Sequence, residues 1–212
     1  MRLIGSKKLT IEENITLDKK LLEQVGKGEI SPLFRFYNFS GEAVVAGVAQ
    51  NVEDYVNVEQ CKKDNVPILK RFSGGGTVFI SKGSLVYSII DKLGVPLKRF
   101  DVRGAYQHFL SSVIDIFCRL KIPAEFHKPC DIAVNNRKIT GNAQAQKFGA
   151  VIVHGSFLIN EDIKKISKYL KHPEEAPEYR ADRPHKEFLC NLSEFGLTYE
   201  KTKEILKQAW EN

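Results

Sequence analysis

Apolar residues near the N-terminus recur at helical spacing and then give way to short runs typical of strands. A helix is predicted after Thr16, a candidate cap, and it ends at Gly26 and Gly28. Its apolar positions are Leu17, Leu21, Leu22 and Val25. The next two runs, 33–39 and 43–47, are rich in aromatic or β-branched residues and are separated by Ser40-Gly41. This pattern predicts two strands paired with each other.

The rest of the chain alternates between the same two periodicities. It predicts helices over 55–64, 101–120, 161–170 and 199–210, and strands over 66–69, 77–80, 85–90 and 150–159. The segment 132–139 predicts a strand, a tight turn at Asn135-Asn136 and a returning strand. The segment 171–188 is rich in Pro, Glu and Arg and predicts a mobile loop over a site. The expected architecture is α+β, a mixed sheet flanked by helices.

Composition places the chain among soluble globular proteins. Its 212 residues fit a single domain spanning 1–212. Hydrophobic residues make up 42% of the chain and charged residues 27%, a composition that excludes general disorder. No apolar stretch is long enough to span a bilayer, and the N-terminus turns polar before a signal-peptide region develops, so a cytoplasmic location without membrane contact is expected. The four cysteines are widely separated and show no close pairing typical of a zinc site or a redox dithiol, which favours reduced thiols.

The positive net charge suits an acidic partner without identifying one. The formal charge is +6, but the lysines are dispersed along the chain. Dispersed lysines are typical of a solvated surface, so nucleic acid is not expected as a partner.

The segment Lys70-Arg71-Phe72-Ser73-Gly74-Gly75-Gly76-Thr77-Val78-Phe79 is the first candidate for chemistry. Glycine lacks Cβ, so successive backbone amides can converge on the oxygens of a phosphate or carboxylate beside a fixed positive charge. A plain hairpin turn is the alternative. The glycines join two predicted strands and lack a following Lys-Ser or Lys-Thr, which distinguishes them from a nucleotide P-loop.

A second group of motifs lies downstream. Asp131 is followed by Lys138, Gly141 and Ala143, and His154-Gly155 comes on the next long strand. Together with Gly47-Val48-Ala49-Gln50-Asn51 and the triple glycine, these segments resemble, in order and spacing, the catalytic domain of lipoate-protein ligase A and its cofactor-transferase relatives. The resemblance runs from about residue 17 to about residue 192. It implies the α+β fold of biotin/lipoate ligases and class II aminoacyl-tRNA synthetase catalytic domains.

The resemblance also implies a two-step reaction. Lipoate and ATP, with Mg²⁺, would form lipoyl-adenylate, and the acyl group would then pass to a lysine of a lipoyl carrier domain, of the 2-oxoacid dehydrogenase E2 or glycine cleavage H protein type. Lys138 matches the family's lysine, which would stabilise charge at the α-phosphate and acyl oxygen. Asp131 would orient Lys138 or the incoming carrier lysine. The residues implied to bind the lipoyl or adenylate group are Arg71, Ser73, Gly74, Gly75, Gly76, Thr77, Val78, Phe79, Gly141, Ala143, His154 and Gly155.

The sequence departs from the family pattern at three points. Relatives often have Asn-Asp where this chain has Cys130-Asp131, and His-Asp where it has Ile80-Ser81. The C-terminal accessory domain common in such ligases is apparently absent, so either a separate accessory subunit completes activation or the enzyme accepts a ready-made acyl group.

Two alternatives to the ligase stay open. The first is an octanoyl or lipoyl transferase that forms a thioester on Cys130, although neither cysteine position known for such transferases is matched. The second is a non-catalytic lipoate- or nucleotide-binding module, against which Lys138 argues. The ligase is the favoured interpretation.

Overall fold

A seven-stranded mixed sheet forms the centre of the molecule. The computed structural model describes residues 1–5, 7–173 and 176–211. The order of the strands in this sheet is β1-β2-β6-β10-β9-β8-β7. Their bounds are Arg2–Leu3 (β1), Leu33–Phe36 (β2), Ser84–Lys92 (β6), Ala124–His127 (β7), Asp131–Val134 (β8), Arg137–Lys147 (β9) and Ala150–Leu158 (β10). Strands β1 and β2 pair in parallel, and the other described pairs in this sheet are antiparallel.

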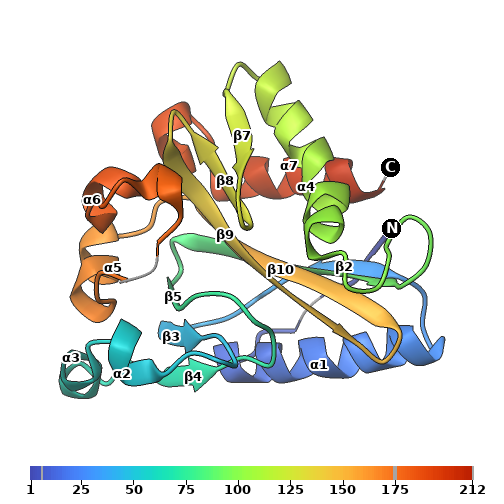
Figure 1. Ribbon diagram of the computed structural model, residues 1–212, viewed down its shortest axis with the longest axis horizontal. Coiled ribbons are helices and arrows are strands. Elements are labelled where there is room, and N and C mark those ends of the chain that lie inside the picture. The colour runs from blue at the N-terminus through green and yellow to red at the C-terminus, as the bar shows by residue number, and fades with distance from the viewer. Residues whose placement is uncertain (6, 174–175, 212) are drawn as a thin grey trace.

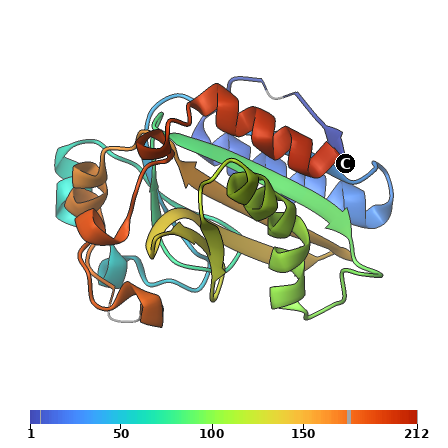
Figure 2. The same cartoon turned by 90° about the horizontal axis from the view of Figure 1, so that it is seen from above.

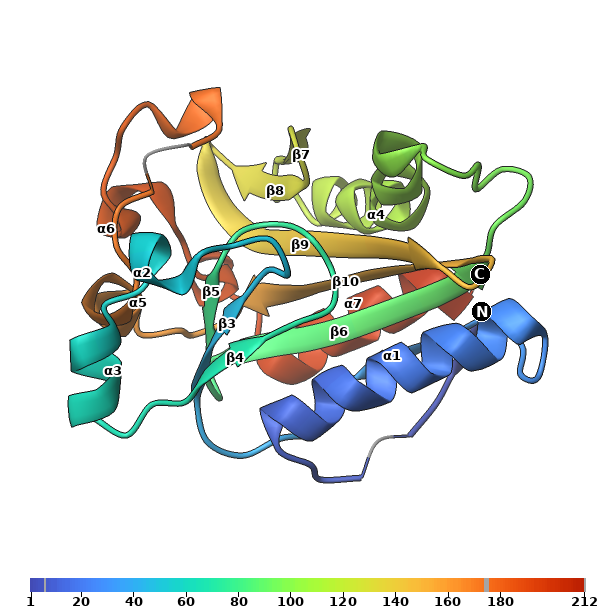
Figure 3. The same ribbon diagram turned by 60° about the horizontal axis from the view of Figure 1, so that its bottom comes forward.

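Helices cover both faces of this sheet. Helix α1 (Ile11–Lys27) lies along one face, and α4 (Val102–Arg119) and α7 (Tyr199–Glu211) lie on the other (Figures 1 and 3). Neighbouring residues of a strand point to opposite faces. Thus Ile90 packs in the cluster with α1 while Ile89 packs in the cluster with α4 and α7. The view from above shows α4 and α7 side by side over β6 and β10 (Figure 2).

A second sheet of three strands stands at one end of the first. Its order is β4-β3-β5, with β4 at Ile68–Lys70, β3 at Ala43–Ala46 and β5 at Val78–Ile80. The predicted pairing of the strands around 33–39 and 43–47 is therefore wrong, because β2 pairs with β6 while β3 pairs with β4 and β5. Every residue of β2 and β3 is buried, so neither strand has the one-sided pattern that specifies a partner.

Two helix predictions also need correction. Thr10, not Thr16, caps α1: Glu13 N donates to Thr10 Oγ1 at 3.1 Å and Thr10 N donates to Glu13 Oε2 at 2.7 Å, a capping box. The predicted end is confirmed at Gly28, which has a φ of 77°. The predicted helix over 55–64 is two helices, α2 (Val52–Tyr55) and α3 (Val58–Lys63), because the buried Val56 between them forms an extended bridge with Leu170.

The hairpin predicted around Asn135-Asn136 is confirmed. Both asparagines have left-handed backbone angles, with φ of 51° and 58°, as a two-residue turn requires. The register between β8 and β9 shifts next to Ile132 and Ala133. Such an irregularity re-aims nearby side chains, and here it lies between Asp131 and Lys138.

The segment 171–188 and its neighbours cover the end where the two sheets meet. This part contains α5 (Ile163–Tyr169), a 3₁₀ turn η1 (Glu178–Arg180), α6 (His185–Phe188) and a second 3₁₀ turn η2 (Leu192–Phe195). Residues 174 and 175 of the predicted mobile loop lie outside the described residues. Of the described helices, none is both long and apolar enough to cross a membrane.

Candidate active site

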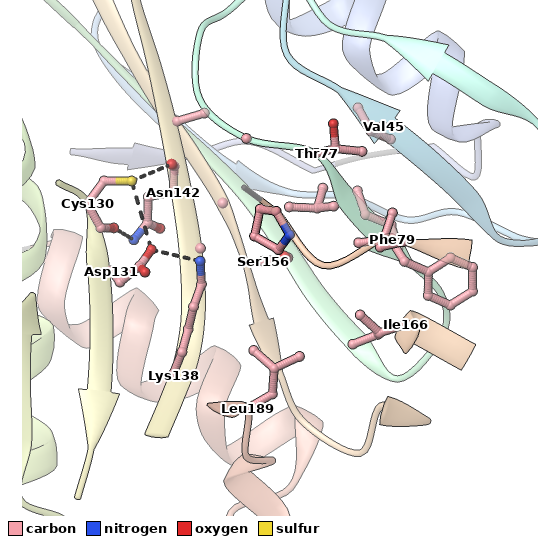
Figure 4. A pocket seen from close by; sticks show the side chains of 18 of the residues that line it. Val45, Thr77, Phe79, Cys130, Asp131, Lys138, Asn142, Ser156, Ile166 and Leu189 are labelled. Carbon is pink, nitrogen blue, oxygen red and sulfur yellow. Dashed lines mark hydrogen bonds and ion pairs between the residues drawn. The ribbon is translucent and has the colours of Figure 1, made fainter. Parts of the chain in front are cut away.

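A pocket of about 530 Å³ opens between the two sheets. Strands β3 and β5 form one wall, β9 and β10 the other, and α5, α6 and the segment before α6 close the remaining side (Figure 4). The described residues of the predicted loop, 171–173 and 176–188, thus border a pocket. The pocket contains most of the residues singled out from the sequence: Arg71, Gly76, Thr77, Val78, Phe79, Cys130, Asp131, Lys138, Gly141, Ala143, His154 and Gly155. Ser73, Gly74 and Gly75 stand directly behind this lining, against His154, Arg71 and Ala143.

Lys138 and Asp131 form an ion pair on the wall of the pocket. Lys138 Nζ lies 2.8 Å from Asp131 Oδ1, with the lysine side chain 24% exposed and the carboxylate 4% exposed. A Cβ at Gly141 would lie 3.1 Å from Nζ, so glycine lets the lysine lie across β9. On the other side, Tyr179 donates its hydroxyl to Asp131 Oδ2 at 2.8 Å. Asp131 therefore orients Lys138 while Lys138 keeps access to the pocket.

Arg71 shapes the glycine loop from inside. Its buried guanidinium donates to Ser73 Oγ at 3.1 Å and to the carbonyl of Val45 at 3.1 Å, and one terminal nitrogen donates to both Gly74 O and Gly76 O at 2.7 Å. Burial lowers the pKa of Arg71 to about 10, so it is still a cation at neutral pH. These bonds engage most of its donors. Its substrate contact stays a prediction, and its structural task is to hold the loop.

The backbone of the glycine loop leaves donors open. Within the described part of the chain, the amides of Gly74, Gly75 and Gly76 have no hydrogen-bond acceptor. Gly75 has a φ of 87°, and its carbonyl would lie 2.0 Å from a Cβ at Gly47, so the two segments touch only because both are glycine. Free successive amides beside a cation are suited to binding an anionic oxygen.

His154 belongs to a buried hydrogen-bonded group behind the loop. Its Nε2 lies 2.6 Å from Ser73 Oγ, and its Nδ1 lies 3.3 Å from Oδ2 of Asp18, a fully buried residue of α1. The sequence analysis missed Asp18. The available signal was its spacing: Asp18 falls on the same helix face as Leu21, Leu22 and Val25, where a charge is unusual.

The wall beside the loop is mainly apolar. Val78 and Val45 line it with Ser156 and Ala143 opposite. Phe79 also touches the pocket, but its ring packs on Tyr169 with the ring centres 5.2 Å apart, so it supports the wall from behind. Thr77 Oγ1 donates to Gln50 Oε1 at 3.2 Å, which ties the loop to the segment after β3.

Gly155 has a packing task in this wall. A Cβ there would lie 2.2 Å from Asn142 Oδ1. The Asn142 side chain uses this space to donate to the carbonyl of Cys130 and to accept from the Tyr87 hydroxyl at 2.6 Å.

Cys130 is held as a thiol. Its Sγ donates to the carbonyl of Asn142 at 2.9 Å and lies 3.9 Å from Asp131 Oδ1 (Figure 4). Burial, and then the charge of Asp131, raise the pKa of the Cys130 thiol to about 11. A nucleophilic cysteine needs the opposite shift, because the thiolate is the reactive form.

A group of basic side chains lines the far end of the pocket. It consists of Lys171, Arg180 and His185, which the sequence analysis did not single out. Arg180 Nε donates to the carbonyl of Arg183 at 2.9 Å, while one terminal nitrogen is buried with no partner among the described residues. Burial and the charge of Arg180 lower the pKa of His185 to about 4. No sequence motif marks these residues, since only the fold brings them to one place.

The chain is similar to known proteins of one family. The model of the lipoyl protein ligase A/B catalytic domain matches residues 10–211. The chain belongs to this family. A probable lipoate-protein ligase A of Mycoplasma pneumoniae is 32% identical over 157 residues, or 74% of this chain and 45% of that relative. The chain thus spans about half the length of this lipoate ligase relative. An octanoyltransferase LipM of Geobacillus kaustophilus is 27% identical and matches 93% of this chain and 80% of its own length.

Solved structures of this family share the fold. A bi-partite lipoate protein ligase from Thermoplasma acidophilum, studied with its E2 lipoyl domain, has a TM-score of 0.79 at 22% identity, covering 99% of this chain and 81% of its own. A lipoate-protein ligase A bound with ATP also has a TM-score of 0.79, at 20% identity, covering 99% and 83%. The predicted α+β architecture, a mixed sheet flanked by helices with a lipoate-ligase fold, is confirmed.

The lowered pKa of His185 predicts how the stability of this protein depends on pH. The folded state keeps His185 neutral down to about pH 4, whereas the unfolded chain takes up the proton near pH 6.5. Since the unfolded state binds more protons between these values, stability falls as the pH drops from about 6.5 to 4. We expect His185→Gln to remove roughly 1–2 kcal/mol of that decline, allowing for partial exposure. Urea unfolding at several pH values measures it, and equal slopes for both proteins would contradict the assignment.

Proposed function

We propose that the chain is the catalytic part of an ATP-dependent lipoate-protein ligase. The observation that carries this proposal is the contrast within one pocket. Lys138 and Gly76, whose amide has no acceptor among the described residues, line the pocket, while Cys130, the thiol among the described lining residues, is held protonated. A pocket with anion-binding groups and no activated thiol suits a phosphate-activated acyl group better than a thioester.

A free carboxylate has a poor leaving group, so the acyl group must be activated before an amine can take it up. In the first step a carboxylate oxygen of lipoate attacks the α-phosphorus of ATP, and the bond to pyrophosphate breaks. In the second step the amine of a carrier lysine attacks the acyl carbon, the bond to AMP breaks, and the amine loses a proton. Negative charge grows on phosphate or acyl oxygens in both steps, and the ammonium of Lys138 would stabilise it. Asp131 keeps the ammonium in position and accepts a bond from Tyr179.

The pocket offers a suitable place for each part of lipoyl-adenylate. The dithiolane chain would lie against Val45, Val78 and Ser156, between the two sheets. The phosphate would lie between Lys138 and the glycine loop, and the nucleotide would extend toward the basic far end that contains Arg180. One buried nitrogen of Arg180 has no hydrogen-bond partner among the described residues, which supports a hydrogen-bond acceptor of the nucleotide there, because an unpaired buried donor is unfavourable.

The expected Mg²⁺ would enter with the nucleotide. The described residues contain no group of three or more His, Cys, Asp or Glu side chains that could hold a metal ion. Magnesium at nucleotide sites is commonly held by phosphates with one or two carboxylates, so a protein cage is not required. Asp131 lines the pocket and is the carboxylate nearest this chemistry, though it is engaged by Lys138 and Tyr179.

The test of this proposal is an assay of carrier modification. The protein is incubated with ATP, Mg²⁺, lipoate and an apo lipoyl domain, and the carrier is weighed by mass spectrometry. A lipoyl mass increase that requires ATP is expected. Modification from octanoyl-carrier protein without ATP, and none from lipoate with ATP, would contradict the ligase and establish the transferase.

The transferase remains the second candidate because of one comparison. A relative named octanoyltransferase matches 93% of this chain, more than the probable lipoate ligase does. The state of Cys130 separates the two functions. We expect Cys130→Ser to keep at least about half of the ATP-dependent activity, since a hydroxyl can replace the thiol as donor to the Asn142 carbonyl. Loss of more than about 90% in a folded variant would point to a thioester on Cys130, and Cys118→Ser, an exposed cysteine outside the pocket, is the control.

The carrier and the accessory subunit are part of the same proposal. A lipoyl carrier domain is the expected acceptor, in line with the E2 lipoyl domain that accompanies the Thermoplasma ligase. Synthetic lipoyl-adenylate bypasses the first step. If this protein transfers lipoate from the adenylate but does not form the adenylate from ATP, a separate accessory subunit is needed for activation.

A further inference from the structure

A buried chain of hydrogen bonds links α1 to the glycine loop. It runs from Asp18 through His154 and Ser73 to Arg71, with heavy-atom distances of 3.3, 2.6 and 3.1 Å. All four residues are at least nine-tenths buried. They come from three separate parts of the fold: α1, β10 and the glycine loop. The two end residues, Asp18 and Arg71, determine which atom is the donor in each of these hydrogen bonds.

At the first end, Asp18 can only accept. Its Oδ1 receives bonds from Arg35 at 2.7 Å and Ser88 at 2.8 Å, and its Oδ2 receives one from the Tyr37 hydroxyl at 2.6 Å. Burial by itself would raise the pKa of Asp18, but the hydrogen bond from His154 and the charge of Arg35 outweigh it, so the pKa lies below its ordinary value. Asp18 is therefore a carboxylate, and the atom of His154 that faces it, Nδ1, carries the hydrogen.

At the other end, Arg71 can only donate. Its Nε hydrogen points at Ser73 Oγ, which must accept it. The Ser73 hydroxyl hydrogen is then free to point at His154 Nε2, which accepts it when the ring is neutral with the hydrogen on Nδ1. With the hydrogen on Nε2 instead, Ser73 would accept twice and its own buried hydrogen would lose its acceptor, which is unfavourable. Both ends thus require the same tautomer of His154.

We propose that Asp18 is a positioning residue of this site: it selects the tautomer of His154 and, through Ser73 and Arg71, the shape of the glycine loop. Arg71 transmits the effect because the same guanidinium donates to Gly74 O and Gly76 O. The Ser-His-Asp order looks like that of a hydrolase triad, but Ser73 is only 1% exposed and its oxygen already accepts from Arg71, so it does not reach an acyl carbon. Only the activity consequence of this proposal rests on the proposed function.

The first test needs no substitution in the protein that is measured. The ring nitrogens of ¹⁵N-labelled histidine report the tautomer by NMR, and His154→Gln assigns the His154 signals by their disappearance. We expect the ring hydrogen on Nδ1 and none on Nε2. A ring with its hydrogen on Nε2, or a doubly protonated ring, overturns the proposal. This result does not depend on any enzymatic activity, so it stands or fails separately from the ligase assignment.

The second test reverses the direction of the hydrogen bond between residue 18 and His154. In Asp18→Asn the amide can donate to His154 Nδ1, so we expect the hydrogen to move to Nε2 and ATP-dependent modification to fall by about tenfold to hundredfold, as a displaced loop would cause. In a Ser73→Ala background, Asp18→Asn is expected to cause a smaller further loss of activity, because Ser73, which links His154 to Arg71, is missing. Equal losses in both backgrounds would show a merely structural role.

Ser88→Ala is the matched control. It also removes a hydrogen bond to the Asp18 carboxylate but does not touch the chain to the glycine loop. It is expected to lower stability while leaving the His154 tautomer and the activity near those of the parent. A shift of the tautomer in Ser88→Ala would contradict the proposed path. If Asp18→Asn does not fold, the tautomer of the parent and the His154 signals of Ser73→Ala still decide the question.

Discussion

Lys138→Ala is expected to lower the rate of carrier modification by about 10²–10³-fold. Lys138 Nζ lines the pocket beside Gly141, and it is held there by Asp131 at 2.8 Å. Removing one preorganised group that stabilises growing negative charge typically costs this much. The fold should survive, since the side chain is 24% exposed and the β9 backbone keeps its bond from Cys190 N to Lys138 O. Mass spectrometry of the carrier, at saturating ATP and lipoate, measures the effect.

Two further variants make this measurement specific. Lys165→Ala removes the same charge and breaks a comparable ion pair, to Glu42 at 2.6 Å, but Lys165 does not line the pocket. It should retain nearly full activity. Lys138→Arg keeps the charge but replaces a compact ammonium by a broader planar guanidinium, so only partial activity is expected. If Lys138→Ala modifies the carrier as fast as the parent, Lys138 has no role in the reaction.

Arg35→Met is expected to lower the free energy of unfolding by about 3–5 kcal/mol, which is the usual effect of removing one partner of a buried ion pair. Arg35 and Asp18 are both 0% exposed at their side chains, and Arg35 Nη1 lies 2.7 Å from Asp18 Oδ1. The other terminal nitrogen donates to Asn14 Oδ1. Without the guanidinium, the Asp18 charge is left in the core with only neutral donors. Methionine keeps much of the volume, so the loss reports on charge more than on packing.

Urea unfolding followed by circular dichroism measures this loss. The control is Lys27→Ala, which removes an ion pair of similar length, Lys27 to Glu23 at 2.6 Å, whose side chains are 53% and 40% exposed. Water screens an exposed pair, so we expect a much smaller change in Lys27→Ala than in Arg35→Met. A loss below about 1 kcal/mol in Arg35→Met would mean that Asp18 is not charged in the folded protein. That result would also remove the basis for the His154 tautomer.

Much of the fold can be read from local patterns. Helix α4 and the hairpin at Asn135-Asn136 were predicted because their signals are contained in a few successive residues: an apolar stripe, and two asparagines that tolerate left-handed angles. The strands that pair with β2 and β3 were not predicted correctly, because pairing depends on residues far away in the chain and both strands are buried throughout. Thr10 was missed as the cap because the buried face of α1 continues from Ile11 through the polar residues Asn14 and Asp18, which interrupt the apolar pattern.

The site divides in the same way. The sequence by itself indicated the family and, through that resemblance, the glycine loop, Lys138 and Asp131 as candidate site residues, because these residues stand in short motifs whose order can be read along the chain. Only the tertiary structure decided what surrounds them. It buried Arg71 among carbonyls, raised the pKa of Cys130 by removing water, and brought Asp18 to His154 across a large separation in the chain. Desolvation and hydrogen-bond geometry depend on long-range packing, which no local pattern encodes.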